Sequence, residues 1–286
     1  IEVSALQSVF AGSLGMMLGF VGGGMIAEAY NWRIALVSVG APGLLLAVVM
    51  ARSLREPARG PFETETPPPP PPIRTTAATM WANPAMRHLI AGSVVAGLVS
   101  YGLTQWLPTF FIRVHDLNQS QTGMLMAGVF GIPGSIGALA FGKWFDRLSH
   151  RGFQHGIWML AVVPFATLPF FIAGLLADNL VTAIVLFIIP GFAANYVIGP
   201  TIAMVQTLSP VQMRAVSSAI MMLCLNLIGM GLGPLLVGLL SDLLTPHHGE
   251  DALSVALAFF TLVGLWGTVH FWLCGRALAK QQQDTE

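Results

Sequence analysis

The residues that could carry out catalysis do not form a catalytic pattern in this sequence. No H-E-x-x-H metal motif occurs, and Ser135, within the segment PGSIG, has no histidine placed to act as its base. Cys224 and Cys274 fall inside apolar runs, which favours small buried side chains over a disulfide or a metal pair. The charged rings of a channel are also lacking from the sequence. We therefore expect no enzyme, no metal and no cofactor.

A second group of polar residues lies inside long apolar runs, where polar side chains are costly and therefore informative. The candidates for lining a substrate cavity are Tyr101, Gln105, Asn195, Tyr196 and Asn226. The alternative for each is a hydrogen bond to a neighbouring helix, worth about 1 kcal/mol. His270 is the only histidine well inside a run; packing or hydrogen bonding is its expected role, with proton transfer as the alternative. No Asp, Glu, Lys or Arg lies deep in a run, so if protons drive the protein, the group that couples them is expected in spans that precede this sequence.

The composition indicates the medium around these residues. The chain of 286 residues is 55% hydrophobic and 9% charged, whereas a soluble domain has about 25% charged residues. A bilayer core needs about 20 apolar residues per helical span, and lipid offers no partner to a free backbone N–H. We expect an all-α polytopic membrane protein with eight helical spans, at about 5–27, 34–51, 88–111, 121–142, 156–177, 180–206, 215–240 and 252–274. The formal net charge of zero gives no basis for a nucleic-acid partner.

The basic residues indicate how the spans are oriented. Of the 13 Lys and Arg residues, eleven fall on the side that holds both chain ends, and only Arg33 and Arg113 fall on the other. Cytoplasmic loops carry such an excess, so both ends of this chain are expected in the cytoplasm. The charged segment FGKWFDRLSHRG, residues 141–152, lies on the same side. We expect a multi-pass protein of the cell (inner) membrane.

A proline-rich segment separates the second and third runs. Pro67 to Pro72 favour polyproline II geometry, which cannot form a span or a sheet. We interpret residues 53–85 as a cytoplasmic linker, with a ligand of SH3-type domains as the alternative. The linker would divide the chain into residues 1–52, with two spans, and residues 86–286, with six.

Two glycine clusters occupy similar places in the first and seventh runs. Glycines four residues apart lie on one helical face and let another helix approach closely. Tight packing alone explains either cluster, but their separation by six spans also fits two related six-span halves. Because the first half would hold six spans and only two of them precede the proline-rich segment, four spans are expected before Ile1. The residues are Gly15, Gly19, Gly23 and Gly24 in the first cluster, and Gly229, Gly233, Pro234 and Gly238 in the second.

The charged segment and the glycine clusters resemble motifs of the major facilitator superfamily of transporters. GKWFDRLSHRG is similar to the loop motif G-x-L-A-D-R-x-G-R-R of that family, and it departs from the motif at Phe145, Ser149 and His150. The resemblance implies twelve helices in two bundles that rock about a central cavity. It also implies a cytoplasmic latch, whose residues are Gly142, Asp146, Arg147 and Arg151, with Arg214 as a partner. An ion pair there gives up to about 4 kcal/mol at 4 Å and an effective dielectric of about 20. The alternative is a solvated loop without a latch.

Longer segments resemble the spinster-like branch of this superfamily. They are residues 31–60, 86–123 and 199–244, which are similar to its sixth span, its seventh span, and its tenth and eleventh spans. The chain would thus match the fifth to twelfth spans. This implies a secondary active transporter of lipid-like amphiphiles in the lipid bilayer. We expect a monomer, and the coupling ion stays open, with protons as one candidate. The alternatives are a transporter of drugs or small organic anions and a truncated fragment that transports nothing.

Overall fold

The computed structural model describes residue 15, residues 18–54 and residues 71–284. This part of the chain contains helices and no strands. The helices begin with Leu18–Ala29, α2 (Trp32–Ser53), α3 (Ile73–Ala82), α4 (Pro84–Val114), α5 (Gln119–Met126), η1 (Ala127–Gly131) and α6 (Ile132–Ser149). They continue with α7 (Phe153–Leu175), α8 (Leu180–Phe192), α9 (Ile198–Leu208), η2 (Val211–Met213), α10 (Arg214–Cys224), η3 (Leu225–Met230), α11 (Gly231–His248), η4 (Gly249–Asp251) and α12 (Ala252–Gln283).

Asparagine begins several of these helices. The side chains of Asn31, Asn83 and Asn179 each accept hydrogen bonds from two backbone N–H groups of the first turn. Asn118 forms a capping box with Gln121 at the start of α5. These bonds satisfy backbone donors that have no partner within the helix. Four of the helix starts are therefore determined by short local sequence patterns.

Five helical segments of the described chain are long and apolar enough to cross a membrane: Trp32–Ser53, Pro84–Val114, Gln119–Ser149, Phe153–Leu175 and Val211–Gln283. The last of these turns back at Gly249, whose φ of 55° suits glycine, and so contains two of the predicted runs. The predicted run at 5–27 lies partly outside the described residues.

The predicted run at 180–206 is not one continuous helix. It is divided into α8 and α9 by the residues 193–197. Pro190 and Pro200 flank this break, and each lacks the N–H that would bond to the carbonyl four residues before it. Backbone away from helical geometry is tolerated at membrane depth where protein buries it or where it lines a cavity. The break therefore marks a position where a cavity is expected.

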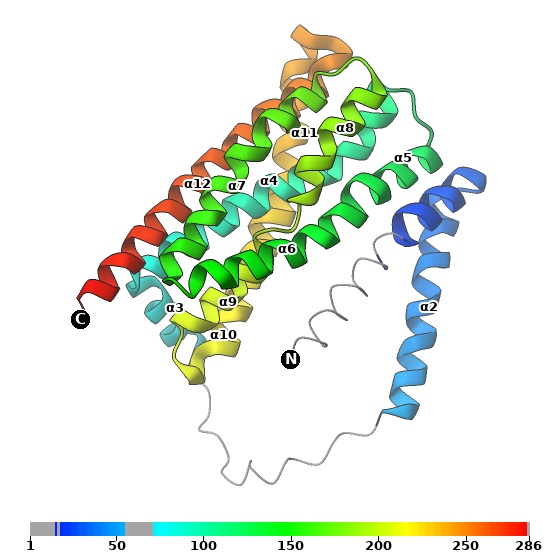
Figure 1. Cartoon of the computed structure of the whole chain (residues 1–286). Helices are drawn as coiled ribbons and strands as arrows, with labels where there is room; N and C mark the ends of the chain where they lie inside the picture. The colour runs from blue at the N-terminus through cyan, green and yellow to red at the C-terminus, as the bar shows by residue number, and fades with distance from the viewer. Residues whose placement is uncertain (1–14, 16–17, 55–70, 285–286) are drawn as a thin grey trace.

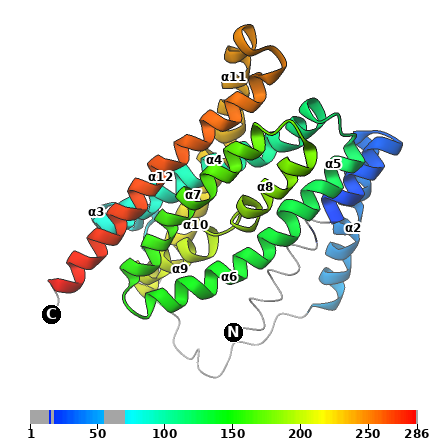
Figure 2. The ribbon, with the colours of Figure 1, turned by 45° about the horizontal axis from the view of Figure 1, so that its top comes forward.

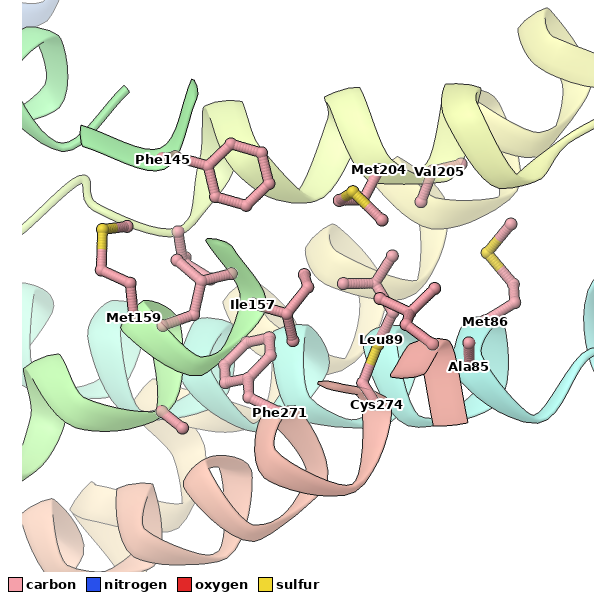
Figure 3. Close-up of a cluster of buried hydrophobic side chains, with 14 of the residues drawn as sticks. Ala85, Met86, Leu89, Phe145, Ile157, Met159, Met204, Val205, Phe271 and Cys274 are labelled. Atoms are coloured by element: carbon pink, nitrogen blue, oxygen red, sulfur yellow. The ribbon is translucent and has the colours of Figure 1, made fainter. Parts of the chain in front are cut away.

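The helices α4 and α12 run side by side through the bundle, with α7 packed against α12 and α11 against both (Figures 1 and 2). Buried apolar side chains form two clusters. Figure 3 shows one of them, where Leu89 of α4 faces Phe271 and Cys274 of α12. Ile157 of α7 and Met204 of α9 complete this part of the core. The second cluster holds Phe110, Phe111 and Phe187, whose rings pack edge to face.

The second glycine cluster lies where η3 and α11 pack against α4. A Cβ atom on Gly233 would overlap the carbonyl oxygen of Leu98 and lie 2.9 Å from the backbone nitrogen of Gly102. Such backbone contact between helices requires glycine on at least one side. In the first cluster, Gly24 lies against Gln119, whereas Gly15, Gly19 and Gly23 have open space in the described structure.

The range expected to be a linker contains the helix α3. It packs against α4 and α10 and buries Thr76 and Met80. The helix α2 differs, because Ala35 is its only buried residue within the described structure. Its large apolar side chains are exposed to the surroundings, as for a helix that lipid or another helix covers.

Candidate functional site

Three of the long helices depart from α-geometry near the middle of the bundle. The segments η1 and η3 are π-helical, and residues 193–197 form the break between α8 and α9. Pro133 and Pro234, just after the π-segments, cannot donate to the carbonyls four residues before them. The backbone bonds shift accordingly, as between the Gly231 nitrogen and the Asn226 oxygen. Such π-segments are frequent at functional sites.

Two of these departures carry three of the candidate residues. Asn226 lies in η3, is exposed, and donates from Nδ2 to the Met222 oxygen over 2.8 Å. Asn195 and Tyr196 lie in the break and are half-buried. The Tyr196 ring packs edge to face on Phe141 of α6, with the ring centres 6.0 Å apart. Asn195 points its amide toward Gly134, also of α6, since a Cβ there would lie 3.3 Å from Nδ2.

The other two candidates lie one turn apart on α4. Tyr101 is half-buried and faces η3, because a Cβ on Gly229 would lie 3.3 Å from the Tyr101 ring. Gln105 is exposed. The five candidates thus form two groups: Tyr101, Gln105 and Asn226 on the neighbouring elements α4 and η3, and Asn195 and Tyr196 at the contact of α6 with the α8–α9 break. The described residues show no hydrogen bond between the two groups.

A half-open cavity of about 130 Å³ lies inside the bundle between α4, α7, α8 and α12. Its wall is mainly apolar, with Leu103, Phe130 and Phe171 among its residues. Of the predicted candidates, only Tyr196 lines it. Four residues with hydroxyl groups also line the cavity, and none of them is among the candidates predicted from the sequence. They are Ser100, Thr104, Thr167 and Thr261.

Sequence signals for these hydroxyl residues do exist. Ser100 and Thr104 are four residues apart, which places them on one face of α4. Thr167 follows Pro164 in α7, and its hydroxyl donates to the Val163 oxygen over 3.1 Å. Because such bonds satisfy a hydroxyl within its own helix, threonine is common in apolar runs and does not stand out there.

The predicted latch residues lie at one end of the bundle. Gly142, Asp146 and Arg147 belong to the end of α6, Arg151 follows it, and Arg214 begins α10. The described residues show no ion pair at Asp146, Arg147 or Arg214. The latch therefore stays a prediction.

The helix Leu18–Ala29 meets the bundle at the other end. Glu28 accepts a hydrogen bond from the backbone nitrogen of Ser120 over 2.8 Å. A Cβ on Gly24 would lie 2.9 Å from the Gln119 oxygen. The segment Gln119–Ser149 is a helix of 31 residues, and the latch residues lie at its far end. The described contact with the first spans is thus remote from the charged segment.

Comparisons with known proteins agree with this architecture. A sequence profile of the Major Facilitator Superfamily matches residues 4–234. An MFS-type efflux pump of Mycolicibacterium smegmatis is 27% identical over 92% of this chain and 60% of its own length. Protein spinster homolog 1 of Xenopus laevis is 24% identical over 97% of this chain and 57% of its own. The chain thus spans about three fifths of the length of these relatives.

Solved structures show the same fold. A bacterial homologue of the human lysosomal transporter Spinster, inward-facing and unoccupied, matches with a TM-score of 0.73 and 21% identity. The match covers 93% of this chain and 65% of that one. The inward-facing, occupied structure gives a TM-score of 0.66 at 20% identity, over 96% and 67% of the two chains. The predicted all-α membrane fold and the resemblance to spinster-like proteins are confirmed. The chain belongs to the major facilitator superfamily and is a multi-pass membrane protein.

Proposed function

We propose that this chain is part of a secondary active transporter that moves an amphiphilic solute by alternating access. The observation that carries the proposal is the cavity between α4, α7, α8 and α12, with its apolar wall and few hydroxyls. A dry cavity of about 150 Å³ can hold a benzene molecule. The volume here is similar, so it suits a ring or the end of an alkyl chain and not a whole lipid.

The polar candidate residues at and around the cavity suit the other end of such a solute. Tyr196 lines the cavity, and its neighbour Asn195 lies in the same break of the helix. Asn226, Tyr101 and Gln105 offer further amide and phenol groups on α4 and η3. An amphiphile would place its apolar part in the cavity and its polar part against one of these two groups of candidates.

Alternating access is supported by the uneven contacts at the two ends of the bundle. The helix Leu18–Ala29 touches α5 at the end remote from the charged segment. With the charged segment in the cytoplasm, as the excess of basic residues indicates, the contact between the described first-half residues and α5 lies on the outer side, as it would in a state closed outside. The same proposal has three further parts. The complete protein is coupled to protons, it works as a monomer, and residues 53–85 are the linker between its two bundles.

A second candidate is a transporter of small drug-like or organic-anion solutes, which the name of the mycobacterial efflux pump favours. The third is a membrane fragment that transports nothing, since the chain spans about three fifths of its relatives. Transport measured with the sequence as given and with its complete coding sequence separates the fragment from the transporter.

The complete protein in proteoliposomes provides the test of the solute. Uptake of a fluorescent lysophospholipid and of a small cationic dye is measured with and without a pH gradient. Thr261→Leu fills the cavity, so lysophospholipid transport is expected to fall at least tenfold. Thr245→Leu is the matched control, because its hydroxyl also bonds to the carbonyl four residues earlier and does not line the cavity. Equal lysophospholipid rates in both variants contradict the proposed site, and transport of the dye alone favours the second candidate.

A further inference from the structure

Two histidines from distant parts of the chain meet between α4 and α12. The Nδ1 atoms of His88 and His270 are 3.0 Å apart, and the ring centres are 5.3 Å apart. His270 thus has a hydrogen-bonding partner, as expected from the sequence, and this partner is a second histidine. The sequence gives no sign of the pairing, because 182 residues separate the two positions.

The short distance restricts how many protons the pair can hold. An imidazole nitrogen donates only when it carries hydrogen, and it accepts only when it does not. A hydrogen bond between two Nδ1 atoms therefore needs one protonated and one bare nitrogen. Two imidazolium rings would bring two donors and two positive charges together, which breaks the bond. From this geometry we infer that His88 and His270 form one binding site for a single exchangeable proton.

One aromatic ring beside the pair stabilises a positive charge there, against the charge repulsion from Arg87. The ring of Trp266 lies 5.7 Å from that of His270, within the range at which an aromatic face attracts a positive charge. Both histidines are half-buried, so a charge there is only partly hydrated. Trp266 is one turn before His270 on α12 and is itself exposed.

The charged residues closest to the pair along α4 and α12 are basic. Arg87 is the neighbour of His88 and acts on it by charge repulsion. On α12, Arg276 lies over the ring of Trp272, with 4.9 Å between the guanidinium carbon and the ring centre. The elements packed against α4 and α12 carry further groups: Arg74 on α3, Arg214 on α10, His155 on α7, Asp242, His247 and His248 on α11, and Glu250 and Asp251 on η4. The described residues show no carboxylate bonded to either ring.

A proton at this position would connect the two helices that form much of the cavity wall. Ser100 and Thr104 of α4 and Thr261 of α12 line the cavity, farther along the same pair of helices. A second proton would separate His88 from His270 and so loosen this end of the α4–α12 contact. The site is new relative to the proposed solute site and does not depend on transport.

The experiment follows the histidine rings by nitrogen NMR, with ¹⁵N-labelled histidine in the full chain in detergent micelles and a chelator present. In the unmodified protein, a scalar coupling between the two Nδ1 nuclei is expected across the hydrogen bond near neutral pH. Acidification is expected to abolish it. Absence of the coupling at every pH overturns the inference, and this measurement needs no variant.

Titration of variants gives the second measurement. The pair should take up protons in two separate steps, whereas His88→Gln or His270→Gln should leave one histidine that titrates in a single step. His155→Gln is the matched control, because His155 packs on Trp158 and not on another histidine; it should leave both steps in place. If His88 and His270 titrate together in one step that removal of the partner does not alter, no proton is shared.

Discussion

The carboxylate of Glu28 lies at the N-terminus of α5, where Oε2 accepts a hydrogen bond of 2.8 Å from the backbone nitrogen of Ser120. This bond connects the helix Leu18–Ala29 to the six-span part of the chain. The start of a helix carries a partial positive charge, so a carboxylate there is stabilised. Alongside it, Gly24 permits close contact with the backbone of Gln119. Phe20 of the same helix packs against the second buried cluster, so the attachment has a polar and an apolar part.

Removal of the Glu28 carboxylate is expected to loosen this attachment. Glu28→Ala should raise the maleimide labelling rate of a cysteine placed at Met124, in the groove beside Glu28, by roughly two- to fivefold. The protein used for labelling has Cys224 and Cys274 replaced, so that neither thiol reacts with the maleimide. Glu28→Gln should give a smaller increase, since it keeps an acceptor oxygen and loses the charge. Tyr30→Phe, at an exposed neighbour, serves as the control, and equal labelling in all variants would refute the attachment.

The contact of α11 with α4 should not tolerate a side chain at Gly233. Gly233→Val places atoms where the Leu98 carbonyl and the Gly102 backbone already lie. Overpacking of this kind costs about 1–3 kcal/mol, so the melting temperature in detergent should fall clearly. Gly199→Val is the matched control, because a Cβ there meets no atom within 4 Å of it. A melting temperature of Gly233→Val equal to that of the control would contradict the described packing.

The helical spans could be predicted because each is a long apolar run. The break within residues 180–206 could not be predicted in the same way. That run is continuous in hydropathy, and only Pro190 and Pro200 indicate the break. In the candidate site, Asn195 and Tyr196 stood out because polar side chains are rare in spans. The hydroxyl of Thr261 did not, since it bonds to the Leu257 oxygen of its own helix.

The stability of the protein should depend on pH through His115, which follows α4 outside the span. Packing against Phe110 and Phe111 lowers the pKa of His115 below its ordinary value of 6.5 by desolvation, and Asp116 opposes this by a smaller amount. The unfolded chain therefore takes up the proton more readily. The stabilising contribution is complete above pH 6.5 and is lost as the pH falls through the folded pKa.

Variants at this position provide the measurement. Melting temperatures on the two sides of pH 6.5 should differ less in His115→Asn than in the unmodified protein. Asp116→Asn removes the opposing charge and should enlarge the difference; asparagine also suits the backbone there, whose φ is 53°. A loss of stability on acidification that is the same in all three proteins would show that His115 does not contribute.

The predicted latch can be tested at Asp146 and Arg214, which show no ion pair in the described structure. If the two pair when the cytoplasmic side closes, Asp146→Asn favours the open state. Transport by the complete protein in proteoliposomes should then be slower, and cysteines on the cytoplasmic side should label faster, while expression is unchanged. Arg214→Gln should have the same effect, and the double variant should be no worse than either, because residues in direct contact are not additive. Lys143→Gln, on the same helix, serves as the control. Transport rates and labelling in Asp146→Asn that equal those of the unmodified protein would exclude the latch and leave the charged segment as a solvated loop.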